Sequence, residues 1–268
     1  YHGFSVEFTE YRQYVPGDDP RYVDWRVYAR SDRYYIKKFE DETNLRCHLL
    51  IDQSRSMTFG SGDWTKADYA HTLAATLAYF LFQQGDAVGL LSFDESIRDY
   101  LPARNRPGHL RQLMLSLEKP AAGQATSIAK PLQRIVELVN KRGLMVLISD
   151  LLAPVEELEA NLGRLTATGH DVVVLRVLDP REIDFDFEDA LLFHDVESEK
   201  DLFIDPAVAK RNYLQRFAEH GDTARAICSK LGADYLQVTT DEPLDQVLAN
   251  YLRQRQRRGK TIQRHANA

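Results

Sequence analysis

Short, almost uninterrupted apolar runs alternate with helical patterns through most of this 268-residue chain. Two of the runs, residues 144–148 and 172–175, contain no polar side chain. Each is long enough for a strand but far too short to span a bilayer. Strands without a polar face are typical of parallel sheets that helices cover on both sides. The chain is therefore predicted to be an α/β protein built on a mostly parallel sheet.

Periodicity places the individual elements along the chain. Strands are expected at residues 45–51, 86–93, 97–101, 144–149, 171–178 and 234–238, and helices at 64–83, 108–117, 127–140, 155–166, 206–231 and 243–257. The strand at 97–101 follows a short turn, so it can pair back as an antiparallel edge strand. The helix at 206–231 is expected to break near Gly221. Ahead of it, an acidic hairpin is expected as a small insertion at about 181–205.

The composition limits the classes of function that fit. A net charge of −6 argues against a general nucleic-acid binder, and 44% hydrophobic residues suffice for one large core. Cys47 and Cys228 lie in apolar segments, which predicts two buried thiols rather than a disulfide framework or a zinc site. Neither a signal peptide nor a membrane span is indicated. A cytoplasmic protein is therefore expected.

The strongest candidate for a binding site follows the first predicted strand of the sheet. That strand leads into Asp52, and Ser54 and Ser56 follow at alternating positions. A later strand ends at Asp150, and Thr126 lies in the loop before the preceding helix. Ligands in open α/β sheets bind at the carboxyl ends of strands, so these five side chains can meet there. Two carboxylates and three hydroxyls suit Mg²⁺, with Mn²⁺ or Ca²⁺ as alternatives, although Thr126 can also serve only as a helix cap.

The pattern Asp52-x-Ser54-x-Ser56, with Thr126 and Asp150 downstream, resembles the metal-ion-dependent adhesion site of von Willebrand factor A-type domains. The resemblance implies a Rossmann-like, six-stranded sheet with helices on both faces and one antiparallel edge strand. It also implies that the three hydroxyls bind the metal directly. The two carboxylates would act mainly through water. The metal could then accept a carboxylate from a protein partner.

A second resemblance lies in the first 44 residues, which are rich in aromatic and charged side chains. Their pattern is Glu7-Phe8-x-Glu10-Tyr11-Arg12-x-Tyr14-x-Pro16-Gly17-Asp18-Asp19-x-Arg21-x-x-Asp24-Trp25-x-x-x-Ala29-Arg30. It is similar to the signature of the bacterial "domain of unknown function 58" family, which implies association with a MoxR-type AAA+ ATPase. We expect residues 1–44 to pack on a von Willebrand factor A-like domain at 45–258, followed by a tail at 259–268. The alternative is a partner-binding surface made by Asp18, Asp19, Arg21, Asp24 and Trp25.

These patterns leave more than one function open. The favoured prediction is a non-enzymatic, metal-dependent protein-binding module that works with the ATPase in the assembly or maturation of protein complexes. The alternative is a metal-dependent hydrolase or phosphatase that uses the same oxygens. The sequence has no Walker-type loop or nucleophile elbow, and His71 is expected to be a packed helix residue. A basic run at residues 253–260 could instead contact nucleic acid or a membrane, although such a run also matches a helix C-terminus.

Overall fold

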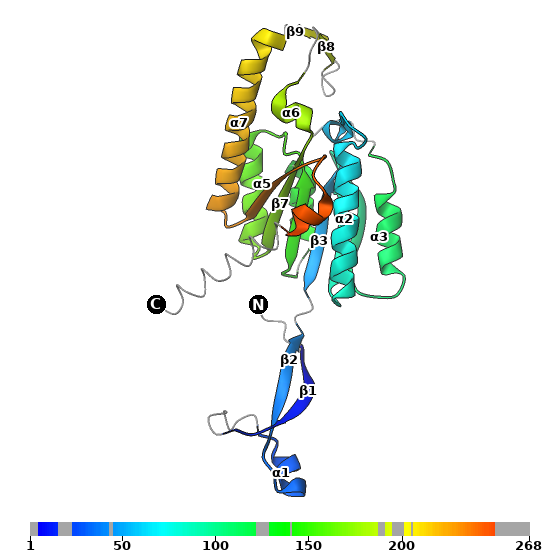
Figure 1. Cartoon of the computed structure of the whole chain (residues 1–268), viewed down its shortest axis with the longest axis vertical. Coiled ribbons are helices and arrows are strands. Elements are labelled where there is room, and N and C mark those ends of the chain that lie inside the picture. Colours follow the sequence, from blue (N-terminus) through cyan, green and yellow to red (C-terminus); the bar gives the residue numbers. More distant parts are fainter. Residues whose placement is uncertain are drawn as a thin grey trace. The chain divides into compact units, whose positions relative to one another are not determined.

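The computed structural model describes residues 5–15, 23–42, 45–121, 129–139, 141–186, 191–194, 201–204 and 206–249. The chain divides into two compact units, Tyr1–Leu45 and Arg46–Ala268, each with its own sheet (Figure 1). The expected packing of residues 1–44 on the larger domain stays a prediction.

The smaller unit is a two-stranded antiparallel sheet with one short helix between its strands. Its elements are β1 (Ser5–Gln13), α1 (Trp25–Ser31) and β2 (Tyr35–Glu42). The side chain of Asp24 accepts hydrogen bonds from the backbone N–H groups of Arg26 and Val27, and so caps α1. The ring of Tyr28 stacks on Tyr34 with 4.4 Å between centroids. Aromatic contacts and a cap thus organise a segment with little apolar core.

The larger unit is built on a six-stranded sheet in the order β10-β7-β6-β3-β4-β5. Its strands are β3 (Arg46–Asp52), β4 (Ala87–Phe93), β5 (Ile97–Arg104), β6 (Leu144–Ser149), β7 (Asp171–Leu178) and β10 (Asp234–Thr239). All neighbours pair in parallel except β5, which is antiparallel to β4 at the edge. The predicted six-stranded, mostly parallel sheet with one antiparallel edge strand is confirmed.

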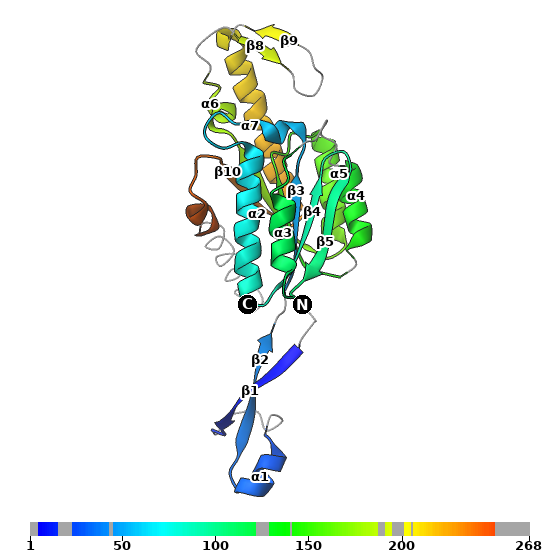
Figure 2. The ribbon, with the colours of Figure 1, turned by 90° about the vertical axis from the view of Figure 1, so that its right-hand side faces the viewer.

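Helices cover both faces of this sheet (Figure 2). They are α2 (Lys66–Gln83), α3 (His109–Leu117), α4 (Ala129–Leu138), α5 (Val155–Ala167), α6 (Pro180–Asp184) and α7 (Pro206–Lys230), and residues 244–249 are also helical. α2 and α3 lie on one face, whereas α4, α5 and α7 lie on the other. The strands are buried between these layers, which explains their continuous apolar runs.

One predicted feature of the helices is wrong. We expected a break near Gly221, but α7 is one continuous helix of 25 residues. A Cβ atom at position 221 would lie only 2.6 Å from Nη1 of the buried Arg176. The glycine therefore allows a buried guanidinium to approach the helix backbone, and it does not end the helix.

Two smaller expectations are confirmed. β8 (Leu191–His194) and β9 (Asp201–Ile204) pair antiparallel, as the predicted hairpin required. Cys47 and Cys228 are both free and buried. Among the described residues, no helix is long and apolar enough to cross a lipid bilayer.

Candidate functional site

Asp52 ends the central strand β3 at the carboxyl edge of the sheet. Its side chain is 1% exposed, and both of its oxygens accept hydrogen bonds. Oδ1 accepts from the backbone N–H of Ser54 at 2.8 Å, and Oδ2 accepts from the hydroxyl of Ser149 at 2.6 Å. Burial and the nearby charge of Asp150 raise the pKa of Asp52 to about 6. The two hydrogen bonds thus fix the orientation of the Asp52 carboxylate, although burial and Asp150 disfavour its charged form.

The two predicted hydroxyl ligands lie in the turn that follows. Ser54 directly precedes a one-turn 3₁₀ helix, Arg55–Thr58, and its side chain is fully buried. The hydroxyl oxygens of Ser54 and Ser56 are 3.1 Å apart. Met57 of the same turn is fully buried, so the turn is anchored in the core. Asp52, Ser54 and Ser56 therefore gather within one short loop, as the alternating spacing predicted.

Asp150 follows β6, the neighbour of β3, and is also completely buried. Because the two strands are parallel, Asp52 and Asp150 lie at the same edge of the sheet. Oδ1 of Asp150 accepts a hydrogen bond from the backbone N–H of Leu152 at 3.2 Å. The intervening residue Leu151 has a φ of 57°, a left-handed conformation that is uncommon for a bulky side chain. The predicted meeting of the two carboxylates at one edge is thus observed.

Sequence reasoning missed the residue that contacts Asp150 most directly. Lys66 is the first residue of α2 and is fully buried, with its Nζ 2.8 Å from Oδ2 of Asp150. The same Nζ lies 2.6 Å from Oε1 of Glu182 in α6. Burial alone lowers the pKa of the Lys66 ammonium, but the two carboxylates outweigh it and the pKa is raised. A charged ammonium is therefore built into the edge of the site.

The end of a third strand, β7, also lies at this edge of the sheet, where it leads into α6. Asp179 follows β7, caps α6, and accepts hydrogen bonds from both the backbone N–H and the hydroxyl of Ser61, at 2.8 and 2.6 Å. Glu182 completes a capping box by accepting from the backbone N–H of Asp179. The Asp179-x-x-Glu182 spacing is a recognisable helix start in the sequence, but it does not reveal that Glu182 meets a buried lysine.

A second buried basic side chain contacts the loop that carries Asp150. Arg176 of β7 is 1% exposed and donates from Nε to the backbone oxygen of Asp150 at 3.1 Å. Its guanidinium lies 5.0 Å from the ring centroid of Phe217 in α7. Nη2 has no hydrogen-bond partner within the described part of the chain. The backbone on which Asp150 is carried is thus fixed by a buried cation.

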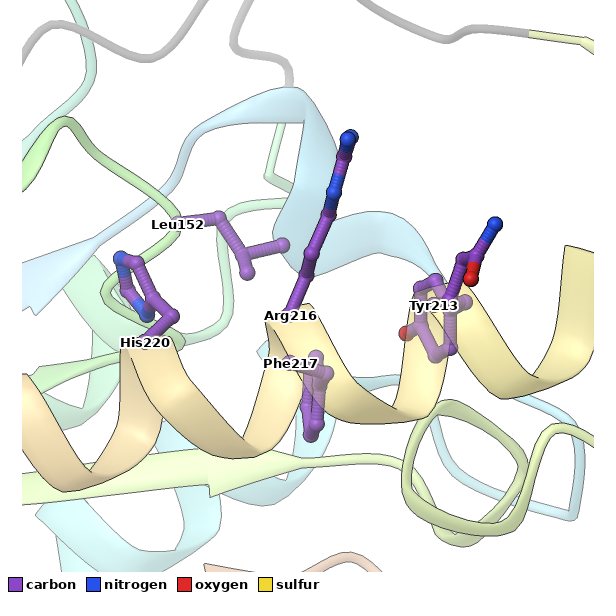
Figure 3. Close-up of a pocket in the computed structure, with 6 residues that line it drawn as sticks. Leu152, Tyr213, Arg216, Phe217 and His220 are labelled. Carbon is purple, nitrogen blue, oxygen red and sulfur yellow. The ribbon is translucent and has the colours of Figure 1, made fainter.

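An aromatic cavity of about 480 Å³ lies beside this loop. It is lined by Leu152, Asn212, Tyr213, Arg216, Phe217 and His220. In Figure 3, Tyr213, Arg216, Phe217 and His220 come from α7, and Leu152 comes from the loop after β6. Asn212 also belongs to α7. Leu152 is 39% exposed, although it lies two residues after the buried Asp150. An aromatic cavity therefore lies next to the polar side chains at the carboxyl edge of the sheet.

Several predicted residues cannot be placed at this site. Thr126, Asp18, Asp19 and Arg21 lie outside the described residues. Asp24 caps α1, and the indole of Trp25 is 61% exposed and nearly perpendicular to the ring of Tyr28. The partner-binding role of these N-terminal residues stays a prediction.

The side chain of His71 bears on the predicted hydrolase. It is half-buried in α2, and its Nε2 is 3.4 Å from Nε2 of Gln53. Burial lowers the pKa of His71, so its imidazole is neutral at pH 7. His71 packs against the residue after Asp52, as expected of a packed helix residue.

The donors present fit a hard divalent ion in kind. Asp52, Ser54 and Ser56 supply only oxygen, which Mg²⁺ prefers, and Mg²⁺ usually takes one or two carboxylates and keeps several waters. Within the described ranges, no three His, Cys, Asp or Glu side chains are grouped closely enough to hold a metal by themselves. An ion here would therefore depend on hydroxyls and water. Lys66 already occupies one oxygen of Asp150.

The chain is similar to a known protein family and to several uncharacterized proteins. The model of the family described as "Protein of unknown function DUF58" matches residues 10–226. An uncharacterized protein of Mycobacterium tuberculosis is 29% identical over 244 residues, which cover 89% of this chain and 76% of the relative. An uncharacterized protein of Mycobacterium avium is 31% identical over 121 residues, or 44% of this chain and 69% of that protein.

One solved structure shares the fold at low sequence identity, and others are more distantly similar. An aerotolerance-related membrane protein from Bacteroides fragilis is 18% identical, with a TM-score of 0.52, over 76% of this chain and 96% of its own. The von Willebrand factor A domain of SpRpn10 is 12% identical, with a TM-score of 0.44, over 77% of this chain and 94% of its own. The six-stranded sheet and its antiparallel edge strand are those that the von Willebrand factor A-type resemblance implied.

Proposed function

The chain belongs to the DUF58 family, and we propose that its larger unit is a protein-binding module that receives an acidic side chain of a partner at the carboxyl edge of its sheet. The observation that supports this proposal best is the meeting of Asp52 and Asp150 with the paired hydroxyls of Ser54 and Ser56. Four oxygen-bearing side chains converge where α/β sheets bind their ligands.

We propose Mg²⁺ as the ion at this site, with Mn²⁺ or Ca²⁺ as alternatives. Ser54 and Ser56 would bind it directly together with Thr126, and Asp52 and Asp150 would act through water. When bound, the ion supplies a positive charge that a partner's carboxylate can complete. Direct ligands without charge leave the ion electrophilic, which suits reversible binding better than hydrolysis.

The partner that we propose is a MoxR-type AAA+ ATPase or a protein on which that ATPase acts, and the process is the assembly or maturation of protein complexes. The proposal rests on what the resemblance of residues 1–44 to the family signature implies. We further propose that the protein works in the cytoplasm, since both of its cysteines are free thiols, as is usual in a reducing compartment.

Titration with Mg²⁺ tests the metal directly. We expect saturable binding by calorimetry and a rise in melting temperature, because an ion that binds only the folded state stabilises it by about 2.7 kcal/mol at 100 times its Kd. Asp52→Asn should abolish both effects. Asp99→Asn is a matched control, because Asp99 lies on β5 in an exposed pair with Lys119.

Binding of a purified MoxR-type ATPase tests the partner. We expect binding to need Mg²⁺ and to be lost with EDTA or Asp52→Asn. Unchanged binding under either condition would contradict a metal-mediated contact. Metal-dependent turnover of a phosphoester that is lost in Asp52→Asn would favour the hydrolase instead.

A further inference from the structure

We propose that Lys66 sets the affinity of the edge site for divalent ions, because its ammonium is an internal cation that a metal must displace from Asp150. This inference rests on the proposed function, since it concerns the same site. It starts from the position of Nζ, which lies 2.8 Å from Asp150 and 2.6 Å from Glu182. Lys66 and Asp150 are both completely buried.

The environment of the ammonium explains why it stays charged. Two carboxylates contact it, and the ring of Phe59 lies 6.0 Å from Nζ, within reach of a cation–π contact. A lysine buried without such partners would lose its proton. The site therefore holds a positive charge of its own beside the loop that carries Ser54 and Ser56.

The ammonium and a divalent ion compete for the same carboxylate. Oδ2 of Asp150 accepts from Lys66, and Oδ1 accepts from the backbone N–H of Leu152. A metal that uses Asp150, directly or through water, would come within a few ångströms of Nζ. Repulsion between a dication and an ammonium is strong in a buried site that water does not screen. Metal binding and the Lys66–Asp150 contact therefore oppose each other.

Glu182 can remain the ion-pair partner of the Lys66 ammonium after it leaves Asp150. Its side chain is 14% exposed and is oriented by its hydrogen bond from the backbone N–H of Asp179. A lysine side chain is long and flexible, so Lys66 can release Asp150 and keep Glu182. Glu182 therefore favours the metal-bound arrangement, whereas Asp150 holds Lys66 in the metal-free one.

This arrangement predicts opposite effects for two variants. Lys66→Met removes the competing charge and should tighten Mg²⁺ binding roughly tenfold or more, as expected for the loss of a cation beside a dication. Glu182→Gln leaves Asp150 as the remaining charged partner of the ammonium and should weaken Mg²⁺ binding. Lys119→Met is the matched control and should leave binding unchanged, since Lys119 is exposed and pairs with Asp99. A purely structural role for Lys66 and Glu182 would change binding in the same direction in both variants.

The experiment is a calorimetric titration of the full chain with MgCl₂, with folding of each variant checked by circular dichroism. Equal or weaker binding by folded Lys66→Met would overturn the inference and leave the proposed function standing. Binding by Lys66→Met alone, with none by the wild type, would support the inference and refute Mg²⁺ binding by the native site. No binding by any variant would refute both.

A measurement on the wild type covers the case in which Lys66→Met does not fold. The side-chain ammonium of a buried, paired lysine gives a ¹⁵N NMR signal that is protected from exchange with water. We expect Mg²⁺ to shift the Lys66 signal while the Lys119 ammonium is unaffected. A Lys66 signal that is unchanged at saturating Mg²⁺ would overturn the inference.

Discussion

Ser149 offers the sharpest test of how the edge of the sheet is held together. Its hydroxyl donates to Oδ2 of Asp52 at 2.6 Å and accepts from the backbone N–H of Leu151 at 2.9 Å. A hydrogen bond to a charged group contributes about 1.5–3 kcal/mol, and a neutral one contributes about 1 kcal/mol. Ser149→Ala should therefore lower the free energy of unfolding by about 2–4 kcal/mol. The substitution removes only one oxygen, so its cavity adds little.

Ser92 supplies the matched control on the neighbouring strand β4. It is 1% exposed, and its hydroxyl has no hydrogen-bond partner in the described part of the chain. Ser92→Ala removes a buried hydroxyl that forms no bond, so its effect on the free energy of unfolding should be neutral or slightly stabilising. Urea denaturation of the two variants, with equal m values, measures the difference. If both variants lose the same stability, the bond between Ser149 and Asp52 does not hold the edge together.

Two further predictions concern other parts of the larger unit. Burial, with the charges of His170 and Arg46, lowers the pKa of His48 from 6.5 to about 4. The stability that depends on neutral His48 is thus complete above pH 6.5, and the free energy of unfolding falls by about 3 kcal/mol as the pH drops to 4. His48→Gln should reduce this fall between pH 6.5 and 4, measured by urea denaturation at each pH. An unchanged pH dependence in the variant would refute the assignment to His48. Gly221→Ala should lower the free energy of unfolding by about 1–3 kcal/mol through overpacking against Arg176. Gly163→Ala is the control in thermal unfolding, because its Cβ would make only an ordinary contact of 3.7 Å with Leu231. Equal melting temperatures of the two variants would contradict this prediction.

The sequence predicts the sheet and the positions of four candidate site residues because both depend on local patterns. Apolar runs without polar breaks mark the buried strands. Asp52 and Asp150 each stand directly after such a run, so a parallel sheet brings them to one edge. The alternating Ser54 and Ser56 need only a tight turn to meet. Each inference uses neighbouring residues, and each is reproduced in the structure.

The residues that were missed depend on contacts between distant parts of the chain. Lys66 meets Glu182 across 116 positions, and nothing near either residue indicates this pair. A lysine in the first turn of a helix is ordinarily solvated. Gly221 was misjudged for the same reason, since its role is set by Arg176 on another strand. Propensity predicts a break at this glycine, and tertiary packing overrides it.

The Lys66–Asp150 ion pair is not what holds the sheet together. β6 is apolar and buried over its whole length until it reaches Ser149. Buried ion pairs often contribute less to stability than apolar side chains of the same volume. Leu151 also adopts a left-handed backbone there, which costs roughly 1–2 kcal/mol. Buried charge and backbone strain coincide at the edge where α/β sheets bind ligands, which favours binding over stability as the reason for the Lys66–Asp150 pair.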